Sequence, residues 1–298
     1  MSTSLNWPRE AACPDAGGSS WHHAGSNLCL DFHGDPLHAG LAVFSDGNHH
    51  MGLAETLQGF VAAHPEVGEV FYASTPPGVL VAALRDGGLW LGNLRLTRLP
   101  EVFISPPGIL DALARDGLVA SHRPFMASRG NVLLVSKGNP LGIRGVTDLL
   151  REDVRLFISS PEHEKASYEV YRETLLNLVG DGERERLTAR LEGREGDTVF
   201  GERIHHREAP QAIFDGHANV AVVYYHLALR YCRIFPETFE IVPLGGNADN
   251  PRPLPGNVCT TYHVGLVGDG GRWGAAFIDY IYSDAVTAIY AGHGLRRP

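Results

Sequence analysis

Short apolar runs alternate along the chain with segments whose apolar residues recur at helical spacing. The runs have strand length and lead into turns rich in Gly, Pro, Ser and Asn. Strands are predicted at 41–44, 69–73, 101–105, 131–136, 154–158, 220–224, 240–244 and 262–267. Helices are predicted at 51–61, 79–84, 109–114, 147–150, 166–178 and 212–214, with a closing pair at 273–290 and a solvated helix and loop at 180–197. This alternation is typical of a parallel or mixed sheet with helices on both faces.

The segment from Leu41 to Phe60 indicates where a ligand would bind. An apolar strand to Phe44 meets the turn Ser45-Asp46-Gly47-Asn48, and a helix follows from Met51. A strand that turns directly into a helix directs several free backbone N–H groups at one place. Their partial positive charge favours anions or polar oxygens. We therefore expect the ligand at this turn.

Length and charge limit the classes of function. A chain of 298 residues is long enough for one large domain or two lobes. The net charge is −9 and no basic block occurs, so nucleic acid is not an expected partner. No stretch approaches the roughly 20 apolar residues of a membrane-spanning helix. Residues 1–20 lack the features of a secretion signal, so the sequence as given predicts a cytoplasmic protein; a different start site would make it periplasmic.

The reactive residue types give no sign of an enzyme. The cysteines are Cys13, Cys29, Cys232 and Cys259. They are far apart, and we expect reduced thiols without a disulfide framework. No GxSxG-type nucleophile motif occurs, and no cofactor is expected. Residues 1–26, rich in Ser, Gly, Pro and Ala, are expected to be a loosely packed arm.

Seven segments carry a family resemblance through their order. They are LAVFSDGNHHMGLAETLQGF, FYASTPPGVLVAAL, EVFISPPGILDALARDGLV, RGNVLLVSKGNP, FISSPEHEKASYEVYRETL, VAVVYYHLAL and FIDYIYSDAVTAIYAGHGL. Their order resembles the class II periplasmic binding proteins, specifically the molybdate- and tungstate-binding kind, over about residues 40–297. The resemblance implies a two-lobed α/β fold with mixed sheets flanked by helices and a two-strand hinge. It implies an N-terminal arm at 1–37, lobe one at 38–125 plus 263–298, and lobe two at 126–262.

The resemblance also implies a function and a site. The expected function is a non-catalytic solute-binding protein that closes two lobes on a small oxyanion of the molybdate or tungstate type. An ABC transporter permease would be its partner if the protein is exported. The expected ligand contacts are Ser45, Asn48, His49, Ser74, Thr75, Ser160, Ala166, Ser167 and Tyr224. Short hydroxyls and amides suit a tetrahedral oxyanion because they donate hydrogen bonds without carrying a mobile charge.

Several residues depart from that pattern and leave an alternative open. A carboxylate at Asp46 is unfavourable beside a dianion, and Pro76 and Pro77 remove two backbone donors. Histidines expected at the same cleft are His49, His50, His163, His205 and His206. Neutral imidazoles bind Ni, Zn or Cu, whereas protonated ones would serve an anion. The alternatives are therefore a transition-metal ligand, or a cytoplasmic ligand sensor or delivery protein.

Overall fold

The computed structural model describes residues 32–298 apart from 92, 203 and 204. Most of the predicted N-terminal arm therefore lies outside the described residues. The described chain forms two compact units. The first, here called lobe one, consists of 32–127 and 261–298; the second, lobe two, is the continuous segment Ser128–Thr260. The chain passes between the two units twice, directly after one strand and directly before another.

Lobe one contains a six-stranded mixed sheet in the order β1-β3-β2-β6-β13-β7. The strands are β1 (Phe32–His33), β2 (Ala39–Ser45), β3 (Glu69–Ser74), β6 (Val102–Ser105), β7 (Val119–Ala127) and β13 (Thr261–Val267). A two-stranded hairpin, β4 (Leu89–Leu91) and β5 (Leu94–Leu96), lies apart from this sheet. Strand β2 runs parallel to β3 and β6, whereas β13 is antiparallel to β6 and β7. The three parallel strands therefore end at one edge of the sheet.

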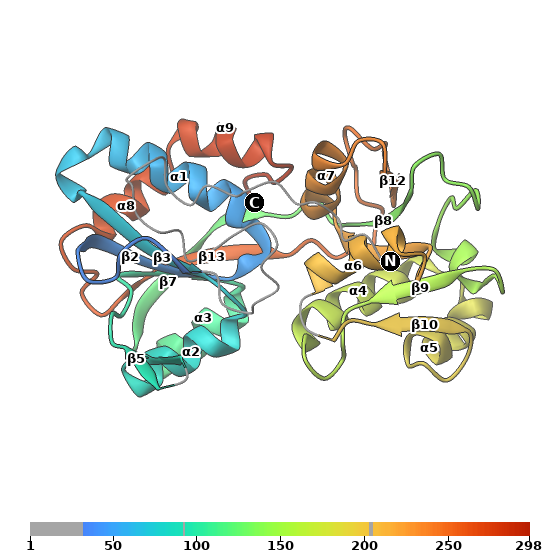
Figure 1. Cartoon of the computed structure of the whole chain (residues 1–298), viewed down its shortest axis with the longest axis horizontal. Helices are drawn as coiled ribbons and strands as arrows, with labels where there is room; N and C mark the ends of the chain where they lie inside the picture. Colours follow the sequence, from blue (N-terminus) through green and yellow to red (C-terminus); the bar gives the residue numbers. More distant parts are fainter. Residues whose placement is uncertain (1–31, 92, 203–204) are drawn as a thin grey trace. The chain divides into compact units, whose positions relative to one another are not determined.

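Helices cover both faces of this sheet (Figure 1). The helices are α1 (His50–Ala63), α2 (Pro77–Asp86), α3 (Pro107–Arg115), α8 (Gly274–Ile281) and α9 (Asp284–Gly292), with 3-10 turns at Gly47–His49 and Pro65–Val67. Successive residues of β2 point to opposite faces, so Val43 packs into the core under α1, α8 and α9, and Phe44 into the core under α2 and α3. Two hydrophobic cores thus hold the parallel strands from both sides.

Lobe two contains a five-stranded mixed sheet in the order β10-β9-β11-β8-β12. The strands are β8 (Asn131–Ser136), β9 (Arg155–Ile158), β10 (Asp197–Phe200), β11 (Val220–Tyr224) and β12 (Phe239–Pro243). The helices are α4 (Lys165–Leu178), α5 (Arg184–Leu191), α6 (His205–Phe214) and α7 (Tyr225–Ile234), with 3-10 turns at Val146–Leu150 and Asp181–Glu183. Strand β9 is parallel to β10 and β11, and every residue of β11 is buried.

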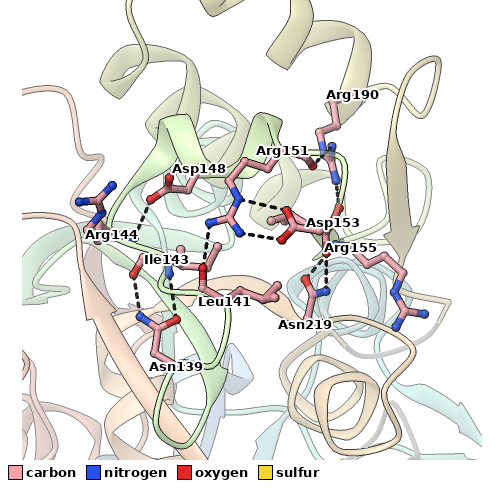
Figure 2. A network of polar contacts seen from close by, with 11 residues as sticks. Asn139, Leu141, Ile143, Arg144, Asp148, Arg151, Asp153, Arg155, Arg190 and Asn219 are labelled. Atoms are coloured by element: carbon pink, nitrogen blue, oxygen red, sulfur yellow. Dashed lines mark hydrogen bonds and ion pairs between the residues drawn. The ribbon is translucent and has the colours of Figure 1, made fainter.

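A polar network braces the connection from β8 to β9 (Figure 2). The amide of Asn139 donates to the carbonyl of Ile143 at 2.7 Å and accepts from its N–H at 2.9 Å. Arg151 forms a two-pronged pair with Asp153. The buried guanidinium of Arg190 donates to backbone carbonyls at the starts of β9 and β10. These bonds fix the start of β9, whose other end carries candidate site residues.

The mixed α/β fold with helix-flanked sheets confirms the prediction from the sequence. Within 32–91, 93–202 and 205–298, no helix combines the length and hydropathy needed to cross a lipid bilayer. The two cysteines in this part of the chain, Cys232 and Cys259, are free thiols.

Candidate functional site

Three parallel strands of lobe one end in polar residues at the same level of the sheet. Ser45, the last residue of β2, lies opposite Ser74 of β3 and Ile104 of β6. The next residues along these strands are Asp46, Thr75 and Ser105. They therefore lie at neighbouring positions, because adjacent strands are about 4.8 Å apart. Their exposed fractions are 2%, 1% and 0%, so all three are buried.

Each of these three side chains has a polar atom without a hydrogen-bond partner among the described residues. The atoms are Asp46 Oδ2, Thr75 Oγ1 and Ser105 Oγ. A buried polar group without a partner costs about 1–3 kcal/mol, and native proteins contain few of them. Three on adjacent strand ends indicate a place where a bound molecule completes the hydrogen bonding.

The two serines before this row have partners within lobe one. Ser45 Oγ donates to the carbonyl of Asp46 at 3.0 Å and lies 3.1 Å from His49 Nε2. Ser74 Oγ lies 3.5 Å from His33 Nε2. The predicted site residues Ser45 and Ser74 are therefore near the row, but their hydroxyls already have contacts. Asn48 is partly exposed, and its backbone N–H donates to Asp46 Oδ1 at 3.1 Å.

The two histidines predicted at this turn differ in their surroundings. His49 is fully buried, with Nδ1 3.0 Å from the hydroxyl of Tyr290 and its ring packed against Phe125 and Tyr262. It lies in the core of lobe one, where it contacts α9. His50 begins α1 and donates from Nδ1 to the carbonyl of Gly47 at 2.9 Å.

Helices α2 and α3 start in the same way, directly after the polar row. Pro77 and Pro107 occupy their first turns, where a missing N–H removes no intrahelical bond. The residues that follow, Gly78 and Gly108, are exposed, and a Cβ added at either would touch nothing. The prolines thus leave a backbone N–H at the second helical position of both helices, and each helix directs its positive end toward the row.

The site residues predicted in lobe two lie where β9 and β11 end. Ser160 Oγ accepts from the backbone N–H groups of Glu162 and His163 at 3.2 and 3.1 Å, which caps the turn before α4. Ala166 and Ser167 lie in the first turn of α4. Tyr224 ends β11, and its hydroxyl accepts from Thr260 at 3.4 Å. The structure thus gathers these residues at the parallel strand ends of lobe two.

His205 is buried in lobe two and uncharged at neutral pH. Its Nε2 donates to the carbonyl of Val222 at 2.9 Å, and its ring packs against Phe157 and Tyr171. Burial lowers the pKa of His205 to about 4. Its backbone N–H donates to the carboxyl of Glu164 at 2.8 Å, and burial raises the pKa of Glu164 to about 7.

The five histidines of the metal interpretation are divided between the two lobes. His49 and His50 belong to lobe one, whereas His163, His205 and His206 belong to lobe two. His163 is exposed, and His206 is the second residue of α6. In the part of the chain that the structure describes, no three His, Cys, Asp or Glu side chains are placed to hold a metal ion.

The sequence analysis missed two residues with unpartnered hydroxyls. Ser105 precedes Pro-Pro-Gly much as Ser74-Thr75 does, and this repeated pattern could have revealed it. Ser159, at the end of β9, is also buried without a partner for its hydroxyl among the described residues. Ser159 precedes the predicted Ser160, but no pattern in the sequence indicates the direction of its side chain.

The chain matches a known protein family and resembles several solved structures. The family model for bacterial extracellular solute-binding protein matches residues 41–296. The sulfate-binding protein from Mycobacterium tuberculosis is 17% identical, covers 86% of each chain and has a TM-score of 0.63. The periplasmic molybdate-binding protein from Azotobacter vinelandii is 17% identical over 87% of this chain and 99% of that chain, with a TM-score of 0.58. The tungstate-binding protein from Desulfovibrio alaskensis is 11% identical over 83% of this chain and 92% of that chain, with a TM-score of 0.54.

These likenesses to solved structures show a shared fold. No curated protein matches the sequence. Proteins of the matched family bind solutes and are not enzymes. Since the family model covers most of the chain, the protein belongs to the bacterial extracellular solute-binding proteins.

Proposed function

We propose that the protein binds a small tetrahedral oxyanion at the strand-end row of lobe one. The row consists of Asp46, Thr75 and Ser105. The observation that carries the proposal is the set of buried, unpartnered side-chain atoms on these three adjacent strand ends. Two of them are hydroxyls, which donate to an oxyanion without adding a charge.

The surroundings of the row favour an anion over a neutral solute. Helices α2 and α3 begin next to Thr75 and Ser105, and the N-terminus of a helix carries a partial positive charge. Their exposed second residues, Gly78 and Gly108, let an anion approach the backbone closely. Burial strengthens each bond, because the site has a lower dielectric constant than water.

The names of the structural neighbours support the same class of ligand. Sulfate-, molybdate- and tungstate-binding proteins share this fold, and each of their ligands is an oxyanion. We extend that class to this chain on the basis of the hydroxyl pair in the row.

Isothermal titration with molybdate, tungstate, sulfate and phosphate tests the proposal. Thr75→Val and Ser105→Ala each remove one donor to a charged ligand. Each is expected to weaken binding by about 1.5–3 kcal/mol, which raises Kd from about tenfold to about 150-fold. Ser121→Ala changes an exposed serine of the same lobe and should leave Kd unchanged. The proposal is wrong if the wild-type protein binds none of these anions, or if both variants bind as tightly as the wild type.

A further inference from the structure

Asp46 differs in chemistry from the other two members of the row. Hydroxyls donate hydrogen bonds, whereas an ionised carboxylate only accepts them. One carboxyl oxygen of Asp46, Oδ1, accepts the N–H of Asn48 at 3.1 Å. The other, Oδ2, is buried and has no hydrogen-bond partner among the described residues. The oxygen without a partner therefore belongs to a group that repels an anion when ionised and can bond to one when protonated.

Among the described residues, two histidines and one tyrosine lie near Asp46. His49 Nε2 lies 4.0 Å from Asp46 Oδ1 and closer, at 3.1 Å, to the hydroxyl of Ser45. His50, on the same loop, donates from Nδ1 to the carbonyl of Gly47. Tyr290 lies on α9, and burial, together with the nearby Asp46 carboxylate, raises the pKa of that phenol. We therefore assign any proton that the site takes up to the carboxyl group of Asp46.

We propose that Asp46 joins the bound oxyanion as a carboxylic acid, so that the site takes up one proton with each fully ionised anion. This inference rests on the proposed function. The proton comes from solvent and stays on the carboxyl group of Asp46. The O–H of that carboxyl group then donates a hydrogen bond to an oxygen of the anion, and the anion itself undergoes no chemical change. A protonated oxyanion such as monohydrogen phosphate brings its own proton, and the ionised Asp46 then accepts from the O–H of the ligand.

The ionisation of the empty site sets the pH range of the effect. Burial raises the pKa of Asp46 to about 7, and the hydrogen bond from Asn48 opposes this rise only in part. Below that pH the empty site already holds the proton, so binding needs none from solvent. Above it, each bound dianion draws in one proton, and affinity falls about tenfold per pH unit. Phosphate loses less affinity over the same range, since its own proton replaces the one from solvent.

Calorimetric titration with sodium molybdate tests the inference, with phosphate as a second arm. For the wild type, Kd should rise about tenfold between pH 7.5 and 8.5. Binding heats at pH 8.5, measured in two buffers with different ionisation enthalpies, should report one proton taken up per molybdate. This proton count needs no variant, so it tests the inference even if a substitution disturbs folding.

Two variants separate Asp46 from other titrating groups. Asp46→Asn keeps the oxygen that accepts from Asn48 and replaces the acid by an amide, which donates at every pH. Its Kd for molybdate should be independent of pH, with no proton uptake. Asp269 makes the same type of turn through Gly271 N–H at 3.0 Å but is exposed. Asp269→Asn should therefore keep the wild-type dependence on pH.

Each contrary result has a distinct meaning. Wild-type molybdate binding that does not change with pH overturns the inference and leaves the proposed function in place. A pH dependence that persists in Asp46→Asn assigns the proton to another group and also overturns the inference. If neither protein binds an oxyanion at any pH, the inference and the proposed function are both wrong.

Discussion

His205 illustrates how the surroundings of one residue decide its chemistry. From the sequence alone, this histidine could bind a metal ion when neutral or an anion when protonated. In the structure its Nε2 donates to the carbonyl of Val222 and its ring packs against Phe157 and Tyr171, so burial lowers its pKa to about 4. It is therefore a neutral structural side chain at pH 7, and its protonation belongs to the acid unfolding of lobe two.

The contribution of His205 to stability should fall as the pH is lowered from about 6.5 toward 4. In the unfolded chain His205 titrates near 6.5, so between these values the unfolded state binds more protons than the native state. Its contribution is complete above pH 6.5. Between pH 7.5 and 5 the loss should be about 2 kcal/mol. Urea unfolding of the wild type and of His205→Phe at both pH values measures this contribution as the difference between the two proteins.

His163 provides the matched control for this measurement. It lies in the same lobe but is exposed, so His163→Phe should keep the wild-type dependence on pH. Glu164 has the opposite effect on the pH dependence of stability. Burial raises its pKa to about 7, so the native state keeps this proton up to a higher pH than the unfolded state does. Only the comparison with His205→Phe isolates the imidazole. Equal pH dependence in the wild type and His205→Phe would contradict the assignment.

The candidate site shows how far single residues can be predicted. The resemblance implies Thr75 as a ligand contact, and Thr75 belongs to the row. The sequence analysis does not predict Ser105, although Pro-Pro-Gly follows it as it follows Thr75. The resemblance implies His49 at the cleft, yet its side chain contacts Tyr290, which is 241 positions away in the sequence. No local pattern predicts which way such a side chain turns, because the partner comes from a distant helix.

At the scale of elements, Asn257 replaces a missing neighbour at the start of β8. Its side-chain oxygen accepts the N–H of Asn131 at 2.8 Å, and its amide donates to the carbonyl of Asn131 at 2.9 Å. Gly130 makes room for this contact. Its φ is +76°, and a Cβ there would lie 2.8 Å from the Asn257 oxygen. The side chain of Asn257 thus provides hydrogen-bond partners for the N–H and C=O of Asn131, as a neighbouring strand would do.

Asn257→Ala should destabilise lobe two by about 2–4 kcal/mol, because it leaves two buried backbone groups of Asn131 without these bonds. Urea denaturation of the full chain, followed by circular dichroism, measures the change. Asn177→Ala is the control, since the side chain of Asn177 is exposed and donates to the carbonyl of Gly256 at 3.2 Å. It should cost less than about 1 kcal/mol. Equal effects of the two substitutions would show that the Asn257 contacts contribute little.

The strands that were predicted and missed differ in their burial. Strands β2, β3, β6, β8 and β11 are almost entirely buried, and their unbroken apolar runs predict them directly. Strand β7 was not predicted, because Ser121 to Pro124 are exposed or partly exposed and interrupt the apolar pattern. Its place in the sheet comes from pairing with β13, which lies more than 130 residues away in sequence. Periodicity reports burial, and it does not report pairing between distant segments.

At the scale of the whole molecule, the two units differ in continuity. All five strands of the lobe-two sheet come from the continuous segment 128–260. Lobe one needs both of its segments, because β13 lies between β6 and β7 in the sheet. The two units should therefore behave differently when each is produced alone.

A fragment of residues 128–260 should unfold cooperatively on heating, as a domain with its own core does. A fragment of residues 32–127 should not, because it lacks β13 and helices α8 and α9, which supply much of the core of lobe one. Near-ultraviolet circular dichroism during a thermal scan distinguishes the two outcomes. A 128–260 fragment without a cooperative transition would show that lobe two depends on the rest of the chain.

The pairing of β7 with β13 has a consequence for how this architecture can be rebuilt. Ala127 ends β7, Thr261 begins β13, and the two residues lie opposite each other in an antiparallel ladder. Lobe two is thus an insertion at the tip of what would otherwise be an ordinary β-hairpin. A two-residue Asn-Gly linker has the geometry to close that hairpin. Removing or replacing lobe two at these two residues therefore requires no cut inside the sheet of lobe one.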